Sequence, residues 1–306
     1  MKVLVTGVDL ETFVREQCLA LEAENVEIIK YQLRKKGVWG YLKEALHIWR
    51  MAEKYHPDII HAHYGLSGLC ANFQRKIPVV TTYHGSDIHR GGWILKLSRL
   101  SMRLSSYNIF VSQKLFEQSG YRKGNSSVIP CGIDLKNIRE VSKETAKKEL
   151  NNPDPFILFS GSFANKVKNP SLAKEAIRKV AGIRLVELKG YSHYEVNLLM
   201  NAADCLLMTS DKEGSPQVIK EAMACGTPIV TVDVGDAKDI IGNTEGCFIA
   251  KRYPDDIAEK IKEAMTFKGK TNGRERIMAL GLGNETIARK IIKIYEQMIK
   301  TTLKDD

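Results

Sequence analysis

The chain alternates short apolar runs with helical patterns along its whole length, and it does so in two successive series. Such alternation is typical of parallel strands joined by crossover helices, because strands that are buried on both faces have no polar side. The first series predicts strands at residues 2–6, 26–31, 58–63, 78–83, 108–112 and 128–130. The second series predicts strands at residues 156–160, 184–189, 205–209, 228–232 and 247–249. The expected fold class is α/β, with two doubly wound parallel sheets and a cleft between them.

A polar stretch between the two series supplies the domain boundary. Residues 134–155 are helix-prone and end in N-N-P-D-P, a sequence rich in breakers of regular structure. At 306 residues the chain is long enough for two domains with separate cores. We predict domains at 1–150 and 151–284, followed by a last helix at 285–306. The apolar residues of that helix share one face, so it packs against another element; they are Ile287, Ile291, Ile294, Tyr295, Met298 and Ile299.

Composition narrows the class of protein and its compartment. Hydrophobic residues make up 43% and charged residues 27%, which is ordinary for a soluble globular protein. The opening M-K-V-L-V-T-G already has the pattern of a strand instead of a signal segment, and no apolar run reaches the roughly 18 residues of a membrane span. Six scattered cysteines without a C-x-x-C pair predict reduced thiols and a cytoplasmic location.

The basic charge of the chain is concentrated in its first half. Of the formal net charge of +10, residues 1–150 carry +8, from 23 Lys and Arg against 15 Asp and Glu. This asymmetry suggests that an anionic partner meets the first domain, although a merely soluble basic surface has the same composition. Nucleic acid is not expected, because the basic residues are not interleaved with aromatic ones on a strand face.

The most informative segment is E-G-S-P-Q-V-I-K-E-A-M-A-C-G-T-P, residues 213–228. It predicts a loop that feeds into a helix, with Ser215 as the N-cap, Pro216 at the first helical position and Gly226 just past the end. Such a helix start presents unpaired backbone N–H groups that can hold an anion or a sugar hydroxyl.

Glu213 and Glu221 in this setting resemble the E-x7-E signature of the retaining GT-B glycosyltransferases of family 4. The likeness is strong over residues 202–232 and moderate over 61–134. It implies a GT-B fold, with two Rossmann-like domains facing a cleft and the helix at 285–306 crossing back onto the first domain. It also implies hexosyl transfer from a nucleoside-diphosphate sugar to a hydroxyl acceptor with retention, in the biosynthesis of a surface polysaccharide or glycoconjugate.

The resemblance assigns roles around this loop. Glu221 would grip the ribose hydroxyls, and Glu213 would contact the donor sugar near its 3-hydroxyl. The amides of Gly214 and Ser215, ahead of Pro216, would add hydrogen bonds to the sugar.

The same resemblance implies that a lysine, and not a metal ion, neutralises the diphosphate. No D-x-D motif occurs, so neither a divalent metal nor any other cofactor is expected besides the donor. In S-G-S-F-A-N-K-V-K-N-P, Lys168 matches the family lysine that neutralises the departing diphosphate, and Gly161 matches the glycine after the strand. The family arginine is missing, because Ser162 follows that glycine. Lys166 is a candidate for the missing charge, with a solvated loop lysine as the alternative.

The first domain contributes a histidine motif, T-T-Y-H-G-S-D. By resemblance the imidazole of His84 would touch the donor sugar and its reacting end, and Asp87 would orient that histidine or a neighbouring loop. Gly7 would bring the backbone of the first β-turn close to the diphosphate and the acceptor. His61 and His63 have a spacing that metal ligands use, but no third ligand is evident and no zinc site is expected.

Residues 90–107 predict an amphipathic basic helix with Trp93, Leu97, Leu100 and Leu104 on one face. In this family such a helix often touches an anionic membrane or a lipid-linked saccharide acceptor, which would make the protein peripheral at the inner face of the cell membrane. An ordinary surface helix that buries its apolar face has the same pattern.

Two rival interpretations stay open. The missing arginine and the short loops also fit a non-catalytic GT-B partner subunit. A sugar-nucleotide epimerase on the same scaffold is the second rival, although the extra carboxylates that its chemistry needs have no evident place in the sequence.

Overall fold

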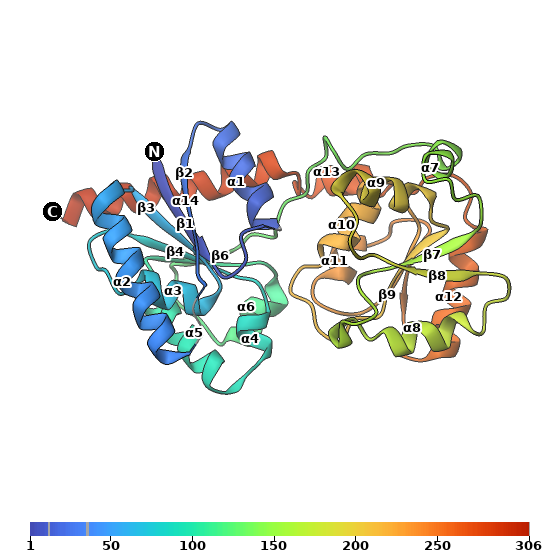
Figure 1. Cartoon of the computed structure of the whole chain (residues 1–306), viewed down its shortest axis with the longest axis horizontal. Coiled ribbons are helices and arrows are strands. Elements are labelled where there is room, and N and C mark those ends of the chain that lie inside the picture. Colours follow the sequence, from blue (N-terminus) through green and yellow to red (C-terminus); the bar gives the residue numbers. More distant parts are fainter. Residues whose placement is uncertain (12, 35–36, 306) are drawn as a thin grey trace. The chain divides into compact units, whose positions relative to one another are not determined.

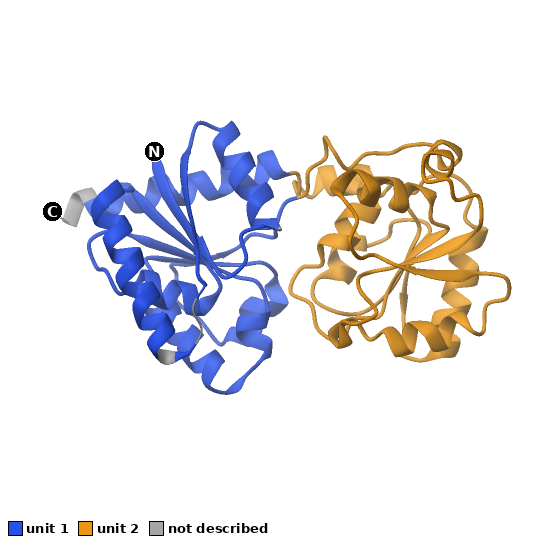
Figure 2. Ribbon diagram, in the orientation of Figure 1, with its two compact units in different colours: residues 1–132, 284–306 blue, residues 133–283 orange. Residues whose placement is uncertain are grey.

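The computed structural model describes residues 1–11, 13–34 and 37–305 (Figure 1). They form two compact units: unit 1 holds residues 1–132 and 284–306, and unit 2 holds residues 133–283 (Figure 2). The division falls before the predicted boundary at residue 150. Helix α7 (Lys143–Glu149) packs on α9 (His193–Ala202), and its Ala146 lies in the core of unit 2. This packing draws residues 133–150 into the second unit.

Unit 1 is built on a six-stranded sheet in which every neighbouring pair is parallel. The strand order is β2-β1-β3-β4-β5-β6, so the direction of winding reverses between β1 and β3. Ligands of doubly wound sheets bind beyond the carboxyl ends of the strands at such a switch point. The strands are β1 (Lys2–Gly7), β2 (Glu27–Gln32), β3 (Ile59–His63), β4 (Val79–Tyr83), β5 (Tyr107–Phe110) and β6 (Ser126–Val128).

Helices cover both faces of this sheet, and successive residues of β1 are buried on opposite faces. Val3 and Val5 belong to the cluster that includes α1 and α14, whereas Leu4 belongs to the cluster that includes α2 and α3. The apolar stripe of α14 is buried in the first of these clusters, which confirms that the last helix crosses back onto the first domain. The helices of unit 1 are α1 (Phe13–Ala23), α2 (Val38–Tyr55), α3 (Gly65–Ala71), α4 (Ser86–His89), α5 (Gly92–Leu104), α6 (Gln113–Ser119) and α14 (Asn284–Asp305).

Helix α5 leaves part of its apolar face exposed. It packs against α3 through small residues, since a Cβ built on Gly65 would come within 2.3 Å of Ser98 Oγ, and one built on Gly68 within 2.4 Å of Ser101 Oγ. This close approach turns the opposite face outward and leaves Trp93 63% exposed.

Unit 2 repeats the same winding on five parallel strands. Its order, β8-β7-β9-β10-β11, corresponds to the first five strands of unit 1, and its switch point lies between β7 and β9. The strands are β7 (Phe156–Phe159), β8 (Arg184–Glu187), β9 (Cys205–Met208), β10 (Ile229–Val232) and β11 (Cys247–Ala250). Besides α7 and α9, the helices are the 3-10 turn η1 (Lys166–Lys168), α8 (Pro170–Ile177), α10 (Gln217–Ala224), α11 (Ala237–Ile241), α12 (Pro254–Thr266) and α13 (Gly273–Ala279).

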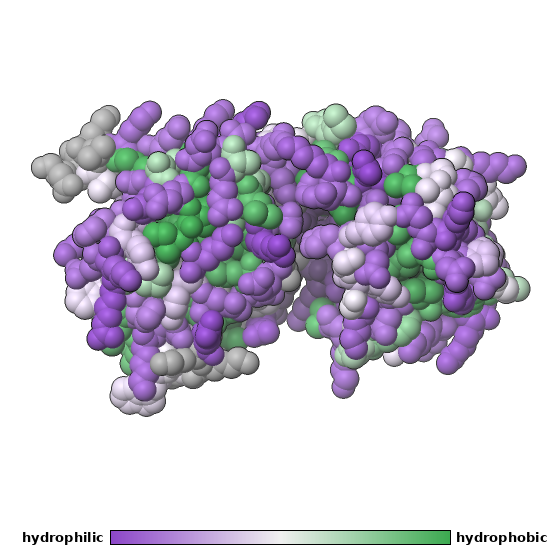
Figure 3. All heavy atoms as spheres, turned by 45° about the horizontal axis from the view of Figure 1, so that its top comes forward, coloured by the Kyte–Doolittle hydropathy of each residue, from purple (hydrophilic) through white to green (hydrophobic). Residues whose placement is uncertain are grey.

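The surface is mostly hydrophilic, with apolar atoms exposed in places (Figure 3). Among the residues described, no helix is long and apolar enough to cross a bilayer. All six cysteines are free thiols.

Candidate active site

The predicted site residues of unit 2 gather at its switch point. Gly161 follows β7, the turn η1 carries Lys168, and Glu213 lies in the loop between β9 and α10. The Thr209 hydroxyl fixes the lysine segment to the end of β9, because it donates to the backbone carbonyl oxygens of Lys168 and Asn169 at 2.9 Å each.

Lys168 and Glu213 form an ion pair in which Nζ and Oε1 are 2.7 Å apart. Their side chains are only 21% and 16% exposed, so solvent screens this pair less than an ordinary surface pair. Gly161 makes room for the lysine stem: a Cβ at that position would come within 3.3 Å of Lys168 Cε. Gly161, Lys168 and Glu213 therefore form one cluster, with the glycine as a packing partner of the lysine.

Glu221 lies nearby on α10 in a different setting. Burial raises the pKa of its carboxyl group, and the nearby His193, Lys220 and Lys168 act in the opposite direction. Lys168 thus acts electrostatically on both carboxylates of the E-x7-E pair. Lys166, by contrast, is exposed on the same turn.

The start of α10 differs from the prediction in two details. Pro216 occupies the N-cap position with an extended backbone, and the helix begins at Gln217, so Ser215 is not the N-cap. The Ser215 hydroxyl instead lies near the carboxylate of Asp236 and helps to lower the pKa of that group. Gly226 follows the helix with φ +64°, as predicted.

A second loop supports the segment that bears Glu213. Gly235 has φ +57°, and a Cβ there would come within 2.9 Å of the carbonyl oxygen of Gly214. The adjacent Asp236 is 8% exposed, and burial raises its pKa to about 6, opposed by Lys220. The fold therefore places the carboxyl group of Asp236 beside the loop that bears Glu213.

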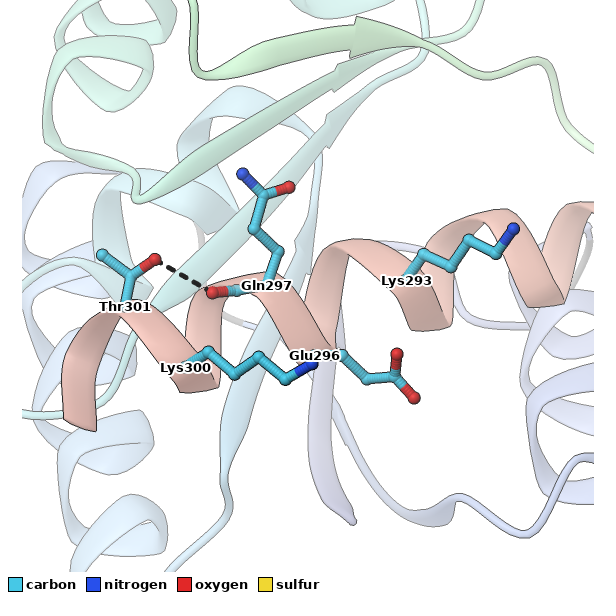
Figure 4. Close-up of a pocket in the computed structure, with 5 residues that line it drawn as sticks. All are labelled: Lys293, Glu296, Gln297, Lys300 and Thr301. Atoms are coloured by element: carbon cyan, nitrogen blue, oxygen red, sulfur yellow. Dashed lines mark hydrogen bonds between the residues drawn. The ribbon is translucent and has the colours of Figure 1, made fainter. Parts of the chain in front are cut away.

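Two hollows are lined by other residues. One of about 490 Å³ lies at the carboxyl ends of β10 and β11 and is lined by Asp233, Ile249, Ala250, Lys251, Arg252 and Tyr253. The other, of about 370 Å³, is lined by five residues of α14 alone (Figure 4). None of the predicted site residues lines either hollow.

In unit 1 the predicted residues also meet at the switch point, where β1 and β3 end. A Cβ on Gly7 would come within 3.2 Å of the Cβ of His63, and His63 Nδ1 lies 2.9 Å from His84 Nε2. Burial lowers the pKa of His84 to about 3, so its imidazole is neutral at physiological pH. Its other ring nitrogen, Nδ1, lies 3.7 Å from Cys131 Sγ.

Asp87 binds backbone amides. Its carboxylate accepts hydrogen bonds from the Gly85 amide at 2.9 Å and the Gly65 amide at 3.3 Å. Burial raises the pKa of this carboxyl group to about 6 despite these donors. These hydrogen bonds tie Asp87 to the loop before α4 and to the start of α3.

Both ring nitrogens of His61 have hydrogen-bond partners. Nδ1 lies 2.5 Å from the Tyr295 hydroxyl of α14, and Nε2 lies 2.7 Å from Thr82 Oγ1. Its sequence pattern therefore reflects the docking of the last helix, a contact between residues 234 positions apart. Within the described ranges, no three His, Cys, Asp or Glu side chains come together as ligands for a metal ion.

Two curated relatives give the sequence context. The chain is 29% identical to the "Putative teichuronic acid biosynthesis glycosyltransferase TuaC" of Bacillus subtilis, over 67% of this chain and 61% of TuaC. It is 28% identical to the "Uncharacterized glycosyltransferase MJ1178" of Methanocaldococcus jannaschii, over 90% of this chain and 86% of that protein. The match thus spans less than two thirds of the first relative and most of the second.

Solved structures share the fold over almost the whole chain. Sucrose-phosphate synthase from Thermosynechococcus elongatus has a TM-score of 0.85 at 18% identity, covering 98% of this chain and 100% of that one. Anabaena HepE, solved in complex with UDP, has a TM-score of 0.74 at 16% identity, with 97% and 100% covered. The UDP-GlcNAc 2-epimerase of Methanocaldococcus jannaschii has a TM-score of 0.63 at 15% identity, with 97% and 100% covered. These likenesses establish the GT-B fold.

Family models match both units separately. The model described as Glycosyltransferase Family 4 matches residues 5–137, which include His84 and Asp87. The model described as Glycosyl transferases group 1 matches residues 184–277, which include Glu213 and Glu221. The chain is therefore related to glycosyltransferases of the GT-B fold through each of its two units.

Proposed function

We propose that this protein transfers a sugar from a nucleoside-diphosphate sugar to a hydroxyl acceptor, with retention of the anomeric configuration and without a bound metal. The observation that carries the proposal is the cluster at the switch point of unit 2. There Lys168 pairs with Glu213 at 2.7 Å and acts electrostatically on Glu221, close to the start of α10. A family model for glycosyl transferases matches the sequence that contains both glutamates.

Each group has a task that suits its setting. Lys168 neutralises the diphosphate as it leaves, aided by the amides at the start of α10. Glu221, held in the helix, binds the ribose hydroxyls, and Glu213 in the loop contacts the donor sugar. His84 contacts the sugar from unit 1. No side chain serves as a covalent nucleophile, and the diphosphate oxygen assists deprotonation of the acceptor on the same face of the sugar.

UDP is the first nucleotide to test, since a protein of the same fold, HepE, was solved with it. We propose a saccharide or lipid-linked saccharide as the acceptor, in the biosynthesis of a surface polysaccharide or glycoconjugate. The link of TuaC to teichuronic acid biosynthesis, by its name, supports a polysaccharide. We place the reaction in the cytoplasm, at the inner face of the membrane.

A basic, apolar surface of unit 1 supports peripheral membrane binding. On α2, four exposed apolar residues recur at helical spacing and form one stripe, with Trp39 79% exposed; they are Trp39, Leu42, Leu46 and Trp49. Helix α5 adds the exposed Trp93, and exposed basic residues lie on both helices: Lys43, Arg50, Lys96 and Arg103. Tryptophan with lysine and arginine suits the interface of an anionic bilayer.

Vesicle sedimentation tests this surface. We expect Trp39→Ala to weaken binding to vesicles that contain phosphatidylglycerol, and neither form to bind neutral phosphatidylcholine vesicles. Tyr253→Ala removes a comparably exposed aromatic ring from unit 2 and serves as the control. Equal binding by the wild type and Trp39→Ala would contradict membrane docking through α2.

The proposed reaction is tested with a panel of UDP-, GDP-, ADP- and TDP-sugars. A matching donor should raise the melting temperature, and the purified protein should slowly release the nucleoside diphosphate from it. Glu213→Gln should abolish this release, which a non-catalytic partner subunit would never show. Glu221→Ala should mainly weaken donor binding, whereas His84→Ala should mainly lower turnover. Wild-type donor affinity and turnover in both variants would refute the site.

The epimerase alternative has a distinct signature. An epimerase on this scaffold would invert a carbon of the sugar and return it as a nucleotide sugar. NMR spectra of the products separate the two reactions, because a transferase leaves the sugar carbons other than C1 unchanged.

A further inference from the structure

A row of three histidine rings ends at the candidate catalytic histidine of unit 1. The rings of His61 and His63 stack with centroids 4.5 Å apart, and those of His63 and His84 with centroids 5.2 Å apart. His63 is fully buried, at 0% exposure, and the mechanism proposed above gives it no task.

Both ring nitrogens of His84 have partners inside unit 1. Nε2 lies 2.9 Å from His63 Nδ1, a normal hydrogen-bond distance, and Nδ1 lies 3.7 Å from Cys131 Sγ, within the longer range of sulfur. The aromatic rings of Phe13 and Tyr64 lie against the imidazole, with centroids 4.6 and 4.9 Å away. The ring is thus held by its nitrogens and by its faces.

The single unpaired nitrogen of this group fixes the direction of the hydrogen bonds. His63 Nε2 is buried, and none of the residues that the structure describes is its hydrogen-bond partner. If His84 donated to His63, neutral His63 would carry its proton on that unpaired Nε2, leaving a buried N–H without an acceptor. If His63 donates through Nδ1, only a lone pair is left unpaired at Nε2. Buried N–H groups without partners are rarer than unsatisfied acceptors, so the second direction is favoured.

We propose that His63 is a positioning residue. Its Nδ1–H donates a hydrogen bond to His84 Nε2 and thereby fixes His84 as the tautomer protonated at Nδ1. His84 then donates from Nδ1 towards Cys131 Sγ. With both nitrogens engaged, the imidazole does not serve as a general base. It presents a fixed, neutral ring at the switch point of unit 1. The role of this ring towards the sugar rests on the function proposed above, whereas the tautomer does not.

Two variants separate the hydrogen bond from the packing. His63→Asn keeps a side-chain N–H at a position close to Nδ1, while His63→Leu keeps bulk and removes the donor. Ring nitrogen shifts of His84, from 15N NMR of the full chain, give the tautomer without any substrate. We expect Nδ1 protonation in the wild type and in His63→Asn, and loss of this fixed state in His63→Leu. Protonation of His84 at Nε2 in the wild type would overturn the proposal.

Kinetics with the donor then tests the consequence for the reaction. Loss of one buried hydrogen bond predicts a fall in kcat of about 10-fold for His63→Leu with little change in KM, and recovery of most of it in His63→Asn. Equal losses in both variants, with both folded by circular dichroism, would overturn the positioning role. If the wild type transfers no sugar at all, the proposed function fails while the NMR result stands by itself.

Discussion

The substitution Asp236→Asn measures how much the buried carboxylate of Asp236, next to the loop that bears Glu213, lowers the free energy of unfolding. Burial raises the pKa of Asp236 from 3.8 to about 6. A group with a raised pKa stabilises the folded state below its unfolded pKa, and this contribution is lost as the pH rises through the folded value. A shift of roughly two units corresponds to about 3 kcal/mol of unfolding free energy. Asparagine has nearly the same shape and never ionises.

We therefore expect Asp236→Asn to be more stable than the wild type at pH 8, by up to about 3 kcal/mol, and similar to it near pH 4. The gain should develop between about pH 4 and pH 6, the window set by the two pKa values. Urea unfolding across this range measures the difference. Asp239→Asn changes an exposed carboxylate on the same helix and should leave the stability nearly unchanged. A difference between Asp236→Asn and wild type that does not vary with pH would refute the reasoning.

Three further predictions concern the two switch points. Lys168→Met should weaken the binding of nucleoside diphosphates by about 10-fold or more, since a charge-assisted hydrogen bond contributes about 1.5–3 kcal/mol. Calorimetry measures the dissociation constant, which should change little in the control Lys166→Met. An equal loss of affinity in Lys166→Met would mean that both lysines bind the diphosphate. Gly235→Ala should destabilise unit 2 by about 1–3 kcal/mol and slow donor turnover, because a Cβ on residue 235, at φ +57°, would lie 2.9 Å from the carbonyl oxygen of Gly214. A variant with the stability and the turnover of the wild type would contradict this reasoning. Tyr295→Phe should lower the free energy of unfolding by about 1–3 kcal/mol, because His61 Nδ1 loses its partner; an unchanged urea midpoint would contradict this.

Local patterns were sufficient for the fold class, whereas the residues of the candidate site came from the resemblance to a family. Alternating apolar runs predict two parallel sheets because crossover helices bury both faces, and both sheets are present. The positions of Lys168 and Glu213 after neighbouring strands brought them to one edge, where the structure joins them in an ion pair. Order along the chain carries such information because parallel strands end on the same side of a sheet.

Contacts between distant residues account for what the sequence did not predict. Ser215 has the chemistry of an N-cap, but in the fold its hydroxyl lies near Asp236, a neighbour that only tertiary packing supplies. The sequence left open whether the apolar face of α5 is buried, and the close packing of its serines on glycines of α3 depends on tertiary contacts that no local pattern shows. His61 is tied to Tyr295 across most of the chain, and no local pattern shows that pair.

The return of α14 to unit 1 has a consequence for how the protein is made. Residues 284–302 leave the ribosome only after all of unit 2, yet they cover one face of the first sheet. At typical translation rates unit 2 takes roughly 10–30 s to synthesise. During that time α14 is not yet available to pack on the apolar surface around Val3 and Val5. Unit 1 therefore completes the burial of this surface only after the last helix has been synthesised.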